Sequence, residues 1–170
     1  MLIRRLAALS TALNQVAAGA AAILLILMVA LILVEIALRF YSHSTFMADA
    51  LVGYGVAAIT FLALGWALEK GTMIRVSVVT QRLSPKARWC ADAFSIVCAE
   101  ALVLFLMFYE WRSIVKLWRR ESVSQHYFPI PLWIPESIFF AGLALLALQL
   151  LVRLCRLATP GREEEASLTL

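Results

Sequence analysis

Two carboxylates inside long apolar stretches, Glu35 and Glu100, are the residues of this sequence best suited to chemistry. A carboxylate within a membrane span is energetically costly, and it marks an ion pair, a buried polar contact or a proton pathway. Glu35 precedes Arg39 by four positions, which puts both on one helix face and predicts an ion pair. Glu100 has no cation three or four residues away. We therefore expect Glu100 to hydrogen-bond to a partner on another helix, of this chain or of another subunit, and proton coupling is the alternative.

The other residue types that carry chemistry do not form a recognisable site. Cys90, Cys98 and Cys155 are scattered without a CxxC pair, so we expect them to be buried and unpaired. His43 and His126 lie outside the apolar stretches, where they cannot serve as haem ligands between helices. Phosphate-binding glycine loops, GxSxG and HExxH are absent from the sequence. The sequence therefore predicts a protein that is not an enzyme and has no cofactor or metal.

Membrane-spanning helices must position these residues. The chain is 63% hydrophobic and 15% charged, whereas soluble domains are about a quarter charged. Residues 6–34 and 50–68 contain no charged side chain, and roughly 20 apolar residues suffice to cross the hydrocarbon of a bilayer. Backbone groups in lipid must be satisfied within their own segment, so the spans are helices. We predict an all-α, polytopic membrane protein with four transmembrane helices.

The predicted organisation is a single four-helix transmembrane domain over residues 1–158. Apolar and polar residues interleave over residues 74–83, which predicts an interfacial amphipathic segment between the second and third helices. Residues 159–170 carry three glutamates and are predicted to be a disordered cytoplasmic tail. The four spans are expected at about residues 13–40, 49–69, 89–111 and 135–154.

The distribution of lysine and arginine predicts the orientation of these spans. With the N-terminus inside, ten of these residues lie on the cytoplasmic side and five on the other side. The positive-inside rule then places both termini in the cytoplasm. Trp66 and Trp89 would mark one membrane interface, and Trp111 and Trp133 the other, because tryptophan is enriched at headgroup level.

Several cations follow the third span on what is expected to be a continuing helix. Arg112, Lys116, Arg119 and Arg120 are spaced so that they share one helix face. Such a stripe either faces solvent and lipid phosphates or docks an acidic partner. We keep both interpretations at this stage.

Several local features follow one another along the chain: Arg39 at the end of the first span, Asp49 before the second, the turn at residues 71–77, Ser122 and Ser124, the Ile-Pro-x-Trp-like entry at residues 130–135, Gly142, and residues 149–151. In order and spacing, these features resemble the small permease subunit of tripartite ATP-independent periplasmic (TRAP) transporters. The resemblance covers nearly the whole chain, and no single motif carries it alone.

The resemblance implies a multi-pass protein of the bacterial inner membrane with two protein partners. These are a large permease subunit, which holds the substrate and coupling-ion sites, and a periplasmic substrate-binding protein, which delivers an organic acid. Uptake would be driven by an ion gradient, usually sodium, without ATP. The small subunit would scaffold the fixed domain of the large subunit during an elevator-like motion. Besides these proteins its partners would be membrane lipids, and nucleic acid is not expected.

This resemblance implies no catalytic, substrate-binding or metal residues in the small subunit. The residues expected to contact a subunit or partner are Glu35, Arg39, Glu100, Arg112, Lys116 and Arg119, and the last three suggest a contribution to binding-protein docking. One alternative is a small proton-coupled exporter that acts as a homodimer through Glu35 or Glu100. A second is an assembly or anchor subunit of a membrane enzyme.

Overall fold

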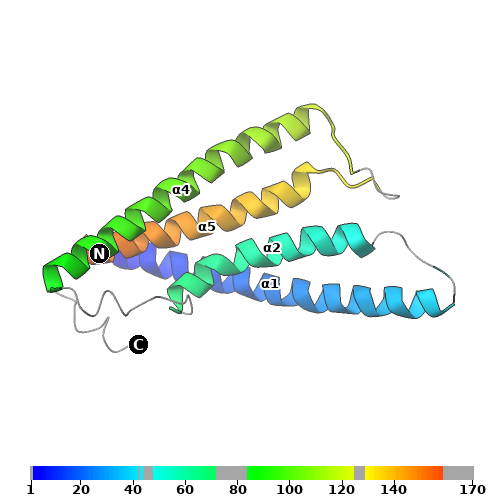
Figure 1. Cartoon of the computed structure of the whole chain (residues 1–170), viewed down its shortest axis with the longest axis horizontal. Helices are drawn as coiled ribbons and strands as arrows, with labels where there is room; N and C mark the ends of the chain where they lie inside the picture. Colours follow the sequence, from blue (N-terminus) through cyan, green and yellow to red (C-terminus); the bar gives the residue numbers. More distant parts are fainter. Residues whose placement is uncertain (1, 42, 44–47, 72–83, 125–128, 159–170) are drawn as a thin grey trace.

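Four long helices make up most of the computed structural model, which describes residues 2–41, 43, 48–71, 84–124 and 129–158 (Figure 1). The helices are α1 (Leu2–Phe40), α2 (Ala48–Glu69), α4 (Pro85–Arg119) and α5 (Trp133–Ala158). All four are long and apolar enough to cross a membrane, and this confirms the predicted fold class. The expected amphipathic segment at 74–83 lies outside the described residues, as does the expected tail at 159–170.

Local signals explain where α4 begins and how the chain returns from it. Ser84 caps the helix, since its Oγ accepts a hydrogen bond from the Ala87 N–H at 3.4 Å. The helix then runs well past Trp111 to Arg119, which confirms the predicted continuation beyond the third span. Glu121 adopts a left-handed conformation with φ of 47°, and this turns the chain back towards α5.

The helices pack as two antiparallel pairs, α1 with α2 and α4 with α5 (Figure 1). α5 also packs against α2 and α1, whereas α4 packs mainly against α5. Because α5 touches the other three helices, it is the central element of the bundle. The start of α1 and the end of α5 lie at the same end of the bundle, as an even number of antiparallel spans requires.

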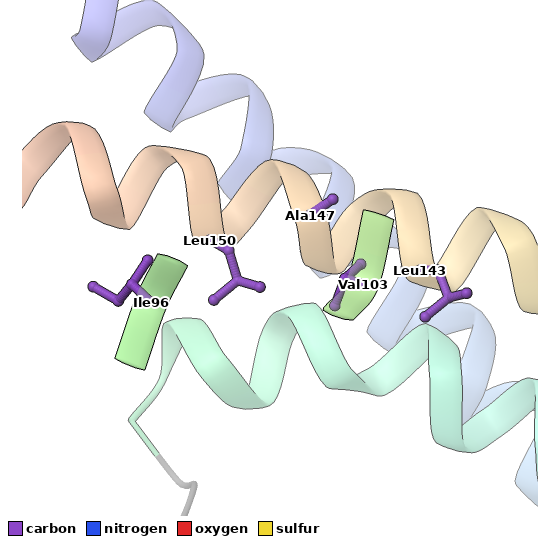
Figure 2. Close-up of a cluster of buried hydrophobic side chains, with 5 residues drawn as sticks. All are labelled: Ile96, Val103, Leu143, Ala147 and Leu150. Atoms are coloured by element: carbon purple, nitrogen blue, oxygen red, sulfur yellow. The ribbon is translucent and has the colours of Figure 1, made fainter. Parts of the chain in front are cut away.

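The apolar core lies where α4, α5 and α2 meet (Figure 2). Phe61 and Leu68 of α2 pack against its edge. Leu143 is the most completely covered core side chain, with 1% of its surface exposed. The buried members of the cluster are Ile96 and Val103 from α4 and Leu143, Ala147 and Leu150 from α5.

α5 and α2 come into backbone contact at Gly142. A Cβ atom on Gly142 would lie 2.6 Å from the carbonyl carbon and oxygen of Phe61, so only a glycine fits there without movement of the helices. The Phe61 ring meets Phe139 edge to face beside this contact. Small residues allow this kind of close helix approach inside membranes.

The two ends of the bundle differ in how closely the helices approach. At the end where α4 begins, the Trp89 indole N–H donates to the Leu157 carbonyl of α5 at 3.2 Å. Towards the opposite end, the two outer helices, α1 and α4, diverge (Figure 1). There α4 stays joined to the start of α5 through edge-to-face contact of Trp118 with Trp133, at 4.8 Å between ring centroids.

Replacing Gly142 by alanine should destabilise the bundle. The added methyl group overlaps the α2 backbone, and overpacking of this kind costs about 1–3 kcal/mol. Gly53→Ala is a matched control, because a Cβ there meets no atom within 4 Å. The free energy of unfolding of the purified protein in bicelles measures both. Equal stability of the two variants would contradict the close contact.

Candidate functional site

Uncharged polar side chains from α1 and α5 meet at one end of the bundle. Ser10 Oγ of α1 donates to Gln149 Oε1 of α5 at 2.5 Å, and Asn14 Nδ2 donates to the same oxygen at 3.3 Å. Ser10 and Asn14 are fully buried, and Gln149 is 6% exposed. We call Ser10, Asn14 and Gln149 the polar junction. Interhelical hydrogen bonds of this kind hold membrane helices together.

α2 completes the polar junction on its third side. The Asn14 side-chain oxygen lies against Gly65, where any Cβ atom would overlap it. One turn further along α2, Glu69 Oε1 accepts a hydrogen bond from Thr11 Oγ1 at 2.7 Å. Thus α1 is joined to α5 and to α2 within the same few turns. Since these polar groups bond to one another, their first role is architectural.

Sequence analysis did not find the polar junction. Gln149 entered only through the family resemblance, and Ser10 and Asn14 were not singled out. The signal that could have found them is the presence of uncharged polar residues among apolar ones at positions 10, 14 and 149. Ser10 and Gln149 are separated by 139 positions, so their meeting depends on how α1 docks on α5.

The expected pair of Glu35 and Arg39 is present. Arg39 Nε donates to Glu35 Oε1 at 3.3 Å along one face of α1. The side chain of Glu35 is 6% exposed, whereas that of Arg39 is 60% exposed. The carboxylate is therefore held inside the bundle, and its partner reaches the surface.

Glu100 is buried, but neither carboxyl oxygen has a hydrogen-bond partner among the described residues, so the expected bond to another helix is not made within this part of the chain. The reason is its neighbours: Ile96 and Val103 lie on the same face of α4 and belong to the apolar core. A carboxyl without partners in such surroundings destabilises the bundle. A bond to a helix of another subunit stays a prediction.

The burial predicted for the three cysteines is wrong, because Cys90, Cys98 and Cys155 are exposed on the helices. A small apolar side chain facing lipid incurs no cost, so the burial rule for soluble proteins does not apply to them. No group of three or more histidine, cysteine or acidic residues that could hold a metal ion occurs in the described ranges.

Arg112, Lys116, Arg119 and Arg120 lie exposed at the end of α4. Together with Trp111 and Val115 they line an open groove of about 390 Å³. We call these four cations the basic stripe. The structure thus brings Arg112, Lys116 and Arg119 together, while Glu35 and Arg39 form a separate pair on α1 and Glu100 lies alone in the core.

Comparison with known protein families shows which family this chain belongs to. The family described as tripartite ATP-independent periplasmic transporters, DctQ component, matches residues 28–159, which include the second part of α1 and all of α2, α4 and α5. The chain belongs to the DctQ family. Neither the curated proteins nor the solved structures gave a match.

Membership in the DctQ family confirms the resemblance and makes the chain a small membrane subunit of a TRAP transporter. DctQ is a transporter component and not a family of enzymes, which agrees with the prediction. The matched residues contain Gln149, whereas Ser10 and Asn14 precede them. In this DctQ chain the polar junction therefore joins the matched region to the start of α1.

Removing the Gln149 side-chain oxygen, which is the shared acceptor of the polar junction, should destabilise the bundle. Gln149→Leu leaves the buried donors of Ser10 and Asn14 without their shared oxygen, and the free energy of unfolding should fall by about 1–2 kcal/mol. Ser95→Ala is the control, since this exposed hydroxyl bonds only to the Ala91 carbonyl of its own helix in the described contacts. Steric trapping in bicelles measures both, and a Gln149→Leu variant as stable as Ser95→Ala would refute the role.

Proposed function

We propose that this DctQ chain scaffolds the large permease subunit of a TRAP transporter, which takes up an organic acid delivered by a periplasmic binding protein. The observation that carries this proposal is that buried polar side chains of α1 and α5 hydrogen-bond to one another. Ser10, Asn14 and Gln149 bond to one another and lock α1 to α5. A bundle fastened in this way suits a fixed support, against which another subunit moves.

An ion gradient, usually of sodium, would drive this uptake without ATP, because the small subunit's family belongs to transporters described as ATP-independent. The coupling-ion and substrate sites would belong to the large subunit. We further propose that the chain resides in the bacterial inner membrane with both termini in the cytoplasm. Ten of its fifteen lysine and arginine residues then lie inside.

The large subunit would dock on the exposed side of the bundle. α1 presents strongly exposed apolar side chains, among them Val16 at 73% and Ile26 at 68%. Arg39 lies at the far end of the same helix, with its guanidinium held by Glu35 and its side chain largely exposed. A cation steadied by a buried carboxylate is suited to pairing with an acidic group of the partner. Glu100 is less suited, because it is covered within this chain.

Co-isolation tests the scaffold role directly. The tagged chain, expressed with the genes that adjoin its own, should co-purify with a much larger polytopic subunit in a stable complex. Arg39→Gln should reduce the yield of that complex several-fold, because the docking side would lose the cation that pairs with the buried carboxylate of Glu35. Ser95→Ala should not change the yield. Isolation as a homodimer with proton-dependent transport would instead support the exporter.

Glu100 provides the second test. Its carboxyl group is buried without a hydrogen-bond partner among the described residues, and this observation favours the exporter. The scaffold role predicts that Glu100→Gln, which keeps the size of the side chain but cannot release a proton, leaves organic-acid uptake within about twofold of the wild type. Uptake is measured in proteoliposomes together with the yield of the complex. Loss of uptake with an intact complex would show an obligatory proton step at Glu100.

A further inference from the structure

The basic stripe is an accumulation of positive charge that this chain does not neutralise. Arg112, Lys116, Arg119 and Arg120 fall within nine residues, and all four are exposed. Among the residues that the structure describes, no carboxylate forms a salt bridge with any of them. The nearest acidic residue towards the core, Glu110, is repelled by Glu136 of α5 and forms no salt bridge with the stripe. The stripe is therefore free to bind an anion from outside the chain.

The depth of the stripe distinguishes between lipid and protein anions. With Trp89 and Trp111 at the two membrane interfaces, as the sequence predicts, the 23 residues from one to the other are 22 helical steps and span about 33 Å, close to the roughly 30 Å of hydrocarbon in a bilayer. Arg112 and Lys116 then lie about 2 and 8 Å beyond Trp111, within the headgroup layer, which is about 5–8 Å thick on each side. Arg119 lies about 12 Å beyond Trp111 and reaches water.

Arg112 is held at the border of the hydrocarbon. Its guanidinium carbon lies 5.6 Å from the centre of the Phe108 ring, a residue one turn closer to the membrane centre. Trp111 and Val115 line the same groove as Arg112 and Lys116. The groove thus offers two cations at phosphate depth, an indole at the interface and apolar surface below them.

We propose that Arg112 and Lys116, together with Trp111, bind the headgroup phosphate of an anionic phospholipid such as phosphatidylglycerol. The chemistry fits, because both cations can donate to the oxygens of one phosphate whose negative charge no headgroup amine compensates. An acidic surface of a soluble protein is the poorer match, since it would have to displace the headgroup layer to reach Arg112. This inference goes beyond the proposed function and is independent of which leaflet contains the stripe.

Native mass spectrometry of the purified full chain in mild detergent tests the site with dioleoyl-phosphatidylglycerol. The Arg112→Gln/Lys116→Gln variant should bind this lipid about 25-fold more weakly, at about fivefold for each cation removed. The matched control, Arg119→Gln/Arg120→Gln, loses the same charge further along the helix and should change binding by less than about threefold. The two inner single variants should each lose about fivefold. Far-UV circular dichroism checks that all variants keep their helix content.

Three results would overturn the proposal. Unchanged lipid binding by the inner double variant would remove the site, and equal weakening by the inner and outer variants would show attraction by net charge without a site. Competition by millimolar inorganic phosphate would show that the groove takes the free anion. If the inner double variant binds lipid normally but lowers uptake at low binding-protein concentration, the stripe docks an acidic protein. Weaker wild-type binding of dioleoyl-phosphatidylcholine, unaffected by either variant, would support the anionic headgroup.

Discussion

The close approach of α5 to α2 at Gly142 is the contact on which the rest of the bundle depends. Apolar burial does not draw helices together in lipid, so association rests on packing and on interhelical hydrogen bonds. Because Gly142 has no Cβ atom, the two helices can touch there; a Cβ would overlap the Phe61 backbone. That contact aligns Leu143, Ala147 and Leu150 with α4. The same contact places Gln149, on the face of α5 that is turned to α1, within hydrogen-bonding distance of Ser10.

The features that follow from local spacing could be predicted from the sequence. Four helices follow from the length of the apolar stretches, and the pair of Glu35 and Arg39 follows from the helical repeat. The continuation of α4 past Trp111 follows from the spacing of its cations. Each of these depends on one segment only, so no knowledge of the neighbouring helices was needed.

The features that depend on which helix faces which could not be predicted. The meeting of Ser10 with Gln149 requires α1 to dock on α5. The surroundings of Glu100 are set by the aliphatic residues that share its face, and a single sequence does not show whether a polar group lies opposite. The exposure of the cysteines likewise depends on the side that each helix turns to lipid.

The divergence of α1 from α4 gives the chain a wedge-shaped outline along the membrane normal (Figure 1). At the narrow end, α1, α2 and α5 are joined by hydrogen bonds, and α4 is joined to α5. At the wide end, the two helix pairs keep their own internal contacts. In a bilayer crossed along the helix axes, we therefore expect the chain to displace more lipid from the leaflet at its wide end than from the other leaflet.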